Sequence, residues 1–395
     1  MTTRAGKRAA DWTVKLARPD QVLSGVTEDA LPAELARLNL RRAFLVVSGS
    51  LNSGTGSIKS IVKALGPRCV GVFDRMPSHT PDSAVVQCAN VARSLDADVI
   101  VSIGGGSVTD GAKAVALCVS NRVDNVEKLQ DFYTKVDANG VRAYPDYPDV
   151  AVKIVCVPTT LSGGEFNSRA GITDTENRVK RSFDHRSLMA SSIIFDPQLA
   201  CHTPSDLFLT TGVRAIDHAV ETLCSVDANP YTDGLAIQAL RLLTPGLREV
   251  AAGAEQAAAR LNCMVGAWMS MTGIVGGLRM GGSHAIGHVL GAAFGVPHGM
   301  TSCITLPAVI EWNESATGEV QQRIAREMGF ASEALAAEMH RFIAELGLPR
   351  RLSDVGVGPE HLELAAEKCL KDDWIYSNPV PLNKDSIVEI LRRCL

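Results

Sequence analysis

Three histidines lie in an otherwise almost wholly apolar stretch at residues 281–300, GGSHAIGHVLGAAFGVPHGM. They are His284, His288 and His298. The first two are four residues apart, so on a helix they project from one face, one turn above the other. Imidazole groups on an apolar background are typical of metal ligands or proton carriers. A buried helix whose histidines only bond to carbonyls is the alternative, and it weakens when three histidines converge with a fourth.

The fourth histidine lies in a second polar group at residues 212–224, GVRAIDHAVETLC. Arg214, His218 and Glu221 follow the spacing i, i+4, i+7, which places them on one face of a helix. An arginine one turn from a histidine can hold a carboxylate or a phosphate. An Arg–Glu pair on a solvated face is a serious alternative for Arg214, but it fits His218 less well.

Two loops with a composition suited to a nucleotide follow apolar runs. The first has Gly104, Gly105, Gly106 and Ser107 between a predicted strand and a predicted helix, and Asp110 and Lys113 follow. Glycines at such a junction let the backbone approach a diphosphate, and the free N–H groups of a helix start favour anions. The second loop, PTTLSGGE at 158–165, has Thr159 and Thr160, which can line phosphates and ribose. A tight turn and an ST-rich turn are the respective alternatives.

The surrounding pattern predicts an α/β half followed by an all-helical half. Continuous apolar strands separated by helices indicate a parallel sheet with both faces covered and with ligands at the carboxyl ends of its strands. From residue 204 onward only helical runs are evident. We therefore predict an α/β dinucleotide-binding domain at 1–198 and a helical domain carrying the histidines at 199–395. The predicted strands are 43–48, 69–73, 98–103 and 152–157, and the helices between them are 57–65, 81–95 and 108–119.

The composition is that of an ordinary globular protein of two domains. The chain has 395 residues, of which 46% are hydrophobic, and a formal net charge of −4 without a long basic block. Nucleic acid and anionic membranes are therefore not expected as partners. The ten cysteines form no CxxC pair, which favours reduced thiols. The uncharged run at 261–278 contains glycines and polar residues, so we expect a buried helix there and a cytoplasmic location.

The chain resembles the iron-containing alcohol dehydrogenase superfamily in its motifs and in their order. The motifs are GGGSVTDGAK, PTT with a following glycine and glutamate, DHAVE, and HAIGHVLG with VPHG. The resemblance covers about residues 40–395. It is closest to the maleylacetate reductases, because of the SHTP sequence at 78–81, the short PTT loop and the NPVP sequence at 378–381. It implies a Rossmann-like domain followed by an all-helical domain (the dehydroquinate synthase-like fold), an NADH or NADPH cofactor, and a homodimer formed through the N-terminal sheet edge.

The resemblance also assigns roles to individual residues. The glycine loop matches the diphosphate loop, Asp110 and Lys113 match the residues that usually follow it, and the threonines match the second nucleotide loop. His288 matches a further active-site histidine near the nicotinamide and the substrate. In the iron enzymes an Asp and three His hold the metal. The three histidines match His218, His284 and His298, and the position of the Asp is occupied by Arg214.

This departure favours a site without metal. A guanidinium offers no acceptor, so it does not ligate a divalent metal and repels one. Asp217 is a neighbour of His218 on the helix and points roughly 100° away, so it should not replace the missing ligand. Three histidines alone can hold zinc. If a metal (iron or zinc) is present, His218, His284 and His298 are its predicted ligands, but we expect none.

A second departure concerns the cofactor. Many members that prefer NAD have an Asp just after the first strand, where it can bind the ribose hydroxyls, and this chain has Gly49. Loss of that carboxylate removes its repulsion of a 2′-phosphate, so NADPH should be tolerated. No Arg or Lys at 49–54 demands NADPH. We expect both cofactors to be used.

The function expected from these features is hydride transfer between NAD(P)H and the carbonyl or activated double bond of a small acidic substrate, as in maleylacetate reductase. Arg214 would stabilise the negative oxygen or hold a substrate carboxylate, and one of the four histidines would donate the proton; their spacing does not tell which one. The alternatives are a metal-dependent alcohol or aldehyde dehydrogenase of the iron type, a lyase similar to dehydroquinate synthase, and a non-catalytic binding protein.

Overall fold

The computed structural model describes residues 13–14, 19–136, 142–177, 179–253 and 256–395. The chain forms two compact units, which divide between Pro204 and Ser205. The first unit is Ala17–Pro204, and the second includes Ser205–Leu395. The domain boundary between residues 198 and 199 stays a prediction.

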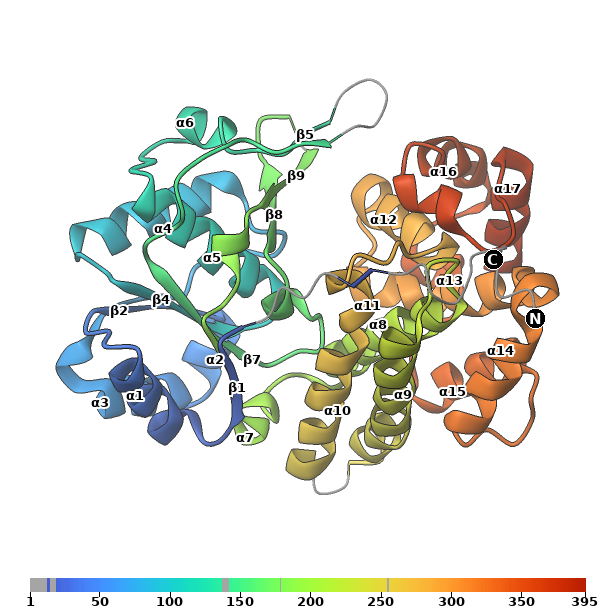
Figure 1. Cartoon of the computed structure of the whole chain (residues 1–395), viewed down its shortest axis with the longest axis horizontal. Helices are drawn as coiled ribbons and strands as arrows, with labels where there is room; N and C mark the ends of the chain where they lie inside the picture. The colour runs from blue at the N-terminus through green and yellow to red at the C-terminus, as the bar shows by residue number, and fades with distance from the viewer. Residues whose placement is uncertain (1–12, 15–18, 137–141, 178, 254–255) are drawn as a thin grey trace. The chain divides into compact units, whose positions relative to one another are not determined.

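The first unit is built on a six-stranded sheet in which every pair of neighbouring strands is parallel, with the order β1-β10-β7-β4-β2-β3 (Figure 1). The four apolar runs of the sequence are β2, β3, β4 and β7, so the predicted parallel sheet is confirmed. The sequence did not predict β1 and β10, which have four residues each. The strands are β1 (Gln21–Ser24), β2 (Ala43–Val47), β3 (Cys69–Phe73), β4 (Val99–Gly104), β7 (Lys153–Pro158) and β10 (Ser192–Phe195).

Helices cover both faces of this sheet. All five residues of β2 are buried, which requires cover on both sides. Leu31 and Ile61, from the helices α1 and α3, share one core with Leu45 and Val101 of the sheet, and α4 and α5 lie on the other side (Figure 1). The helices of this unit are α1 (Thr27–Arg37), α2 (Gly49–Gly54), α3 (Ser57–Leu65), α4 (Asp82–Ser94), α5 (Gly106–Ser120), α6 (Val126–Gln130) and α7 (Pro197–Ala200). Two small antiparallel pairs complete it: β5 (Lys135–Val136) with β6 (Arg142–Ala143), and β8 (Arg169–Asp174) with β9 (Val179–Asp184).

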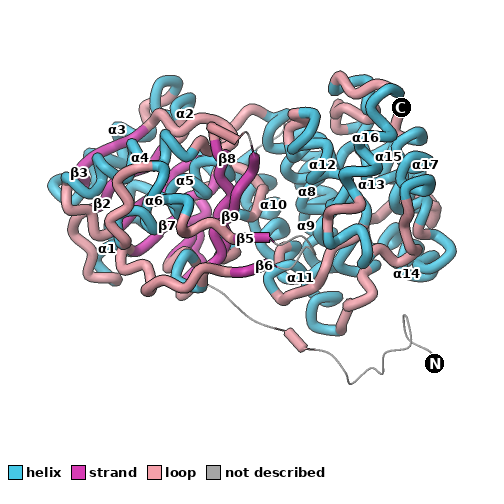
Figure 2. Tube along the Cα trace, turned by 90° about the horizontal axis from the view of Figure 1, so that it is seen from above, coloured by secondary structure: helices cyan, strands magenta, loops and turns pink. Residues whose placement is uncertain are grey.

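The second unit is helical throughout its described residues, and Figure 2 shows strands in the first unit alone. The uncharged run at 261–278 is divided between α10 and α11. In the part of the chain that the structure describes, no helix has the length and apolar character needed to span a bilayer. The helices are α8 (Ser205–Cys224), α9 (Pro230–Ala251), α10 (Gln256–Ser270), α11 (Thr272–Val275), α12 (Gly282–Phe294), α13 (His298–Trp312), α14 (Glu314–Glu327), α15 (Leu335–Glu345), α16 (Leu362–Cys369) and α17 (Lys384–Arg393).

The helix α8 is the centre of the second unit. All its residues from Phe208 to Cys224 are buried, and it packs against α9, α10 and α13. Arg214 is 4% exposed and Glu221 is 6% exposed. The alternative of an Arg–Glu pair on a solvated face is therefore wrong. Both charges lie in the interior and must be satisfied there.

Candidate active site

The four histidines that the sequence singles out form two pairs. His218 of α8 and His284 of α12 form the inner pair, with ring centroids 4.9 Å apart. They are 5% and 1% exposed, and burial lowers the pKa of each ring well below its ordinary value. Both rings are therefore neutral at pH 7.

Glu221 fixes His284 and the start of α12 together. One carboxylate oxygen accepts from the Gly281 amide at 2.8 Å and the other from the Ser283 amide at 2.8 Å. Since this carboxylate is an acceptor, the imidazole Nδ1–H of His284 donates to it, also at 2.8 Å. The helix lacks a side-chain cap of its own at Gly281. Glu221 therefore satisfies its free amides from another helix and sets the tautomer of His284.

Arg214 and Asp217 form a buried ion pair on α8. The guanidinium Nη1 lies 3.7 Å from Asp217 Oδ2 and donates to Ser302 Oγ at 3.0 Å. The same Asp217 oxygen accepts from the hydroxyls of Ser302 at 2.6 Å and Ser283 at 2.8 Å. Burial, and then the neighbouring charge of Glu221, raise the pKa of Asp217 to about 7. A Cβ at the nearby Gly287 would lie 2.9 Å from Thr301 Oγ1, so glycine permits this close approach of α12 and α13.

The outer pair consists of His288 and His298, whose parallel rings are 5.8 Å apart. A tight connection brings them together: α12 ends at Gly295, where φ is 69°, and α13 begins at His298 after a proline. The His288 side chain is 37% exposed, and His298 is an exposed residue. Arg214 Nη2 lies 3.0 Å from His298 Nε2. The histidines that the sequence singles out are thus brought together, but only two of them are accessible within this unit.

Of the four positions that the resemblance assigns to a metal, those of Arg214 and His298 do not fit one. A guanidinium always donates, so Nε2 of His298 must accept from Arg214, and its lone pair is then used. Among the described residues, Asp217, Glu221 and His284 are the group whose ligand atoms lie within 4.8 Å of one another. The hydrogen bonds that hold these three residues already involve both Glu221 oxygens, Asp217 Oδ2 and His284 Nδ1, and Arg214 lies beside Asp217.

A segment near the C-terminus supplies residues that the sequence did not single out. Asp372 Oδ2 lies 2.8 Å from His288 Nδ1. The Trp374 ring lies 5.2 Å from the His288 ring and 5.8 Å from the His284 ring. Asn378 Oδ1 accepts from the Gly282 amide at 3.0 Å. The NPVP sequence therefore begins with a residue that caps α12.

In the first unit, the two loops predicted to bind a nucleotide lie side by side. The Thr159 amide donates to the Gly104 carbonyl at 3.0 Å. A Cβ at Gly105 would lie 3.0 Å from Thr160 Cγ2, so this approach requires glycine. Gly104 itself has a φ of 153°. The helix α5 begins directly after Gly105 without a side-chain cap, which leaves its first amides suited to an anion.

The structure turns Lys113 into the interior and places the Asp110 carboxylate near Gly164 and Gly171. Lys113 is 0% exposed, and its ammonium group donates to the carbonyls of Gly164 at 2.6 Å, Asn167 at 2.5 Å and Arg169 at 3.0 Å. An ammonium has three protons, so these bonds use all of them. Lys113 therefore supports the loop at 164–169 and is not open to a phosphate. Burial raises the pKa of Asp110, and Lys113 and Lys180 oppose this effect.

The structure gives a steric reason for glycine at position 49. Gly49 begins α2, and a Cβ at this position would lie 2.8 Å from the carbonyl oxygen of Asp74. The Asp74 side chain, which follows β3, accepts from Asn52 Nδ2 at 2.8 Å. A carboxylate thus lies near position 49, but it comes from the neighbouring strand. Its sequence signal was an acidic residue at the carboxyl end of a predicted strand.

The SHTP segment touches the glycine loop. His79 and Thr80 have φ values of 64° and 51°, which residues other than glycine rarely adopt. The His79 amide donates to Ser107 Oγ at 3.2 Å, and Thr80 Oγ1 donates to the Ser107 carbonyl at 2.9 Å. Strain of this kind persists where the surroundings fix it, often near functional sites. Ser107 is therefore held from the neighbouring β3–α4 connection.

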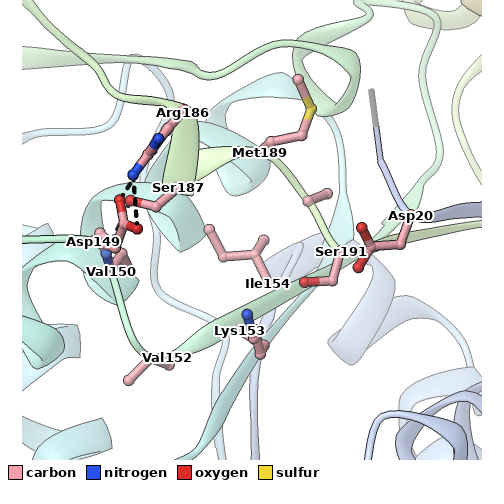
Figure 3. Close-up of a pocket in the computed structure, with 11 residues that line it drawn as sticks. Asp20, Asp149, Val150, Val152, Lys153, Ile154, Arg186, Ser187, Met189 and Ser191 are labelled. Carbon is pink, nitrogen blue, oxygen red and sulfur yellow. Dashed lines mark hydrogen bonds and ion pairs between the residues drawn. The ribbon is translucent and has the colours of Figure 1, made fainter. Parts of the chain in front are cut away.

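A polar cavity of about 250 Å³ lies elsewhere in the first unit (Figure 3). Lys153 begins β7 and Ser191 precedes β10, so the cavity lies at the amino ends of these strands. Arg186 pairs with Asp149 on its wall at 3.2 Å. Ligands of parallel sheets bind at the opposite ends of the strands, where the glycine loop lies. The cavity is therefore separate from the candidate cofactor site.

Comparison with known proteins identifies the family of this chain. Residues 19–197 match the family described as iron-containing alcohol dehydrogenase, and residues 208–395 match the C-terminal part of the Fe-containing alcohol dehydrogenase family. Dehydrogenase ALT3 of Alternaria alternata is 32% identical over 385 residues, which cover 89% of this chain and 98% of the relative. Maleylacetate reductase of Burkholderia cepacia is 31% identical over 361 residues, which cover 91% of each chain.

A solved structure extends the similarity to the fold. The maleylacetate reductase from Agrobacterium tumefaciens superposes with a TM-score of 0.81 at 27% identity, and the match covers 97% of this chain and 98% of that one. The order of motifs, the parallel sheet with its helical second unit and these relatives agree with one another. The chain belongs to the iron-containing alcohol dehydrogenase family of oxidoreductases, near its maleylacetate reductases.

Proposed function

We propose that the protein is an NAD(P)H-dependent reductase that acts on the carbonyl or activated double bond of a small acidic substrate without a metal ion. The contact between Arg214 and His298, at 3.0 Å, carries this proposal. It puts a permanent cation at the position that the resemblance assigns to a metal-binding aspartate. An enzyme that lacks the metal needs another positive charge for the developing oxyanion, and Arg214 supplies one.

Arg214 suits this task because it is buried. A positive charge in a low-dielectric surrounding attracts a developing negative oxygen more strongly than a charge in water does. Its Nη1 is held by Ser302, so little reorganisation accompanies the reaction. The arginine also favours a substrate that carries a carboxylate, which is consistent with the maleylacetate reductases among the relatives.

The first unit offers the features expected of a nicotinamide cofactor site. The loop from Gly104 to Ser107 and the uncapped start of α5 suit the diphosphate, and Thr159 and Thr160 lie beside them. When bound, the cofactor supplies the hydride. Lys113 supports this region from behind rather than binding a phosphate.

The reduction consumes one hydride and one proton, so a residue of this chain must donate the proton. His218 and His284 are buried and neutral, and Nε2 of His298 accepts from Arg214. His288 is half-buried, so it is the histidine that we assign as the proton donor. Its Nε2–H bond breaks as the hydride reaches the substrate carbon and the substrate oxygen takes the proton. A cytoplasmic location and a homodimer remain part of the proposal.

The experiment is an assay of NADH and NADPH oxidation with a panel of 2-keto acids, unsaturated keto acids including maleylacetate, and neutral ketones and aldehydes of matched size. We expect oxidation with an acidic member and a much lower kcat/KM with its neutral counterpart. Oxidation confined to neutral aldehydes would contradict the acidic substrate class. Turnover without net oxidation would indicate a lyase, and tight NADPH binding without any turnover would indicate a binding protein.

A further inference from the structure

His288 differs from the other three histidines in what holds it. Its ring is parallel to the ring of His298, at 5.8 Å, and lies 5.2 Å from the ring of Trp374. Its side chain is 37% exposed, whereas those of His218 and His284 lie in the interior. The ring is thus packed against two aromatic neighbours while its side chain stays partly exposed.

Asp372 holds the other edge of this ring. Its Oδ2 lies 2.8 Å from His288 Nδ1, and its Oδ1 accepts from the Trp374 amide at 3.0 Å. The second bond caps the short 3₁₀ helix η7 (Asp373–Ser377). Each oxygen of the carboxylate therefore has a separate partner, and the two bonds together fix its plane relative to the imidazole.

The segment that carries Asp372 is anchored to α12, the helix that carries His288. Ser377 Oγ donates to the Met280 carbonyl at 2.6 Å, and Asn378 caps Gly282 at 3.0 Å. Ile375 is fully buried in one core cluster with Ile286 and Leu290 of α12. Movement of the carboxylate relative to the imidazole would break these contacts. His288 and Asp372 are 84 residues apart in sequence, and these contacts hold them together.

We propose that Asp372 is a positioning residue that keeps the proton on Nδ1 of His288 and so makes Nε2 the atom that donates the proton to the reduced substrate. An ionised carboxylate only accepts, so Nδ1 must carry a hydrogen. The mobile proton of the imidazolium then resides on Nε2, at the edge that Asp372 does not occupy. Proton transfer from Nε2 then leaves a neutral ring whose remaining proton is on Nδ1. This inference rests on the proposed function.

The test is Asp372→Asn, assayed with the best substrate of the wild-type panel. Asparagine keeps an oxygen for the Trp374 amide, so the cap of η7 survives. Its NH₂ group can face Nδ1 only as a donor, which selects the wrong tautomer. We expect kcat to fall on the order of 10-fold to 100-fold, as for other residues that orient a functional histidine. KM for the cofactor should stay unchanged.

Isotope effects separate this role from a structural one. Slow proton donation raises the solvent deuterium isotope effect on kcat and lowers the primary effect of cofactor deuterated at C4. Asp372→Glu should recover part of kcat, and Asp373→Asn, on the adjacent exposed carboxylate, should leave all three quantities unchanged. Wild-type isotope effects and kcat in Asp372→Asn would overturn the inference. If that variant does not fold, Asp372→Ser, which retains a cap, gives the same readouts. Failure of the proposed function would show separately, as absence of wild-type turnover.

Discussion

The inner and outer histidine pairs of the second unit use the same side chain under opposite conditions. His218 and His284 are buried, and burial lowers the pKa of both. His288 and His298 lie four and fourteen residues beyond His284 in sequence, yet one is half-buried and the other is exposed. In the inner pair His284 is bonded to Glu221, and in the outer pair His288 is bonded to Asp372 and His298 to Arg214. The residue type alone therefore does not fix the role; its partners and exposure do.

This difference assigns a structural role to the inner pair and a catalytic role to His288 of the outer pair. His284 and Glu221 join α8 to the start of α12, so changes there should reduce stability. His288 has an accessible edge and an anchored carboxylate, so changes there should reduce turnover. The predictions below test this division, from the largest expected effect to the smallest.

Replacement of the outer His288 should have the largest effect. We expect His288→Gln to lower kcat by about 10²-fold to 10⁴-fold, which is the usual contribution of a general acid. The midpoint of urea unfolding should hardly change, because the ring is partly exposed. Steady-state kinetics and urea unfolding of the same sample measure both quantities. A large loss of stability with a normal kcat would reverse the roles of the two pairs.

The charge of Arg214 should come next. We expect Arg214→Met combined with Asp217→Asn to lower kcat/KM for the acidic substrate by about 10²-fold to 10³-fold, as when one oxyanion donor is removed. The double change avoids leaving an unpaired buried carboxylate. Asp217→Asn alone is the control and should retain most of the activity. An equal loss of kcat/KM in Asp217→Asn alone would show that the guanidinium charge does not contribute to catalysis.

The inner His284 should affect stability instead. In His284→Leu, the buried Glu221 loses a hydrogen-bond donor, and we expect the free energy of unfolding to fall by about 1.5–3 kcal/mol. Urea unfolding measured at several pH values checks this. An unchanged free energy of unfolding in His284→Leu would mean that the contact between His284 and Glu221 does not stabilise the fold.

Asp217 should give the protein a pH-dependent stability. Its pKa in the folded state is about 7, above the value of about 3.9 in an unfolded chain. Between these values the folded state binds more protons, so the free energy of unfolding falls as pH rises, by up to about 1.4 kcal/mol per pH unit from this group. The loss is complete above pH 7 and absent below pH 4. Asp217→Asn should remove this contribution between pH 5 and 7, and an unchanged slope would refute it.

The smallest effect should concern the cofactor. The Asp74 carboxylate near Gly49 should disfavour a 2′-phosphate by about 1 kcal/mol, the energy of two charges 4 Å apart in water. We expect Asp74→Asn to raise kcat/KM for NADPH relative to NADH about fivefold. The exposed Asp96→Asn serves as the control. If the ratio of kcat/KM for NADPH to that for NADH does not change, the Asp74 carboxylate does not affect the choice of cofactor.

The sequence predicted the local features well. Apolar runs and glycine-rich junctions identified β2, β3, β4 and β7, and the glycine loop lies where β4 ends. The four-residue strands β1 and β10 give too few alternations to be recognised. The histidine spacing correctly indicated a helix, whereas the burial of His284 is what the alternative of a buried helix described.

The partners of these residues were not predictable, because they come from distant parts of the chain. Asp372 lies 84 residues from His288, and Asn378 lies 96 residues from Gly282. Helical periodicity places a residue on a face but does not say what packs against that face. Asp217 shows the same limit: its carboxylate belongs to a buried network with Ser283 and Ser302, which its position on the helix did not predict. Lys113 follows the glycine loop in sequence, yet it is turned into the interior.

The most direct test of the account is to measure metal content and activity in one sample. The protein is dialysed against a strong chelator, its bound iron and zinc are quantified, and its oxidation of NAD(P)H with the acidic substrate is measured before and after dialysis. Because Arg214 occupies the position of a metal-binding aspartate, we predict undiminished kcat in protein that holds far less than one metal ion per chain. Activity that disappears with the metal, and returns in proportion to added Fe²⁺ or Zn²⁺, would contradict the account.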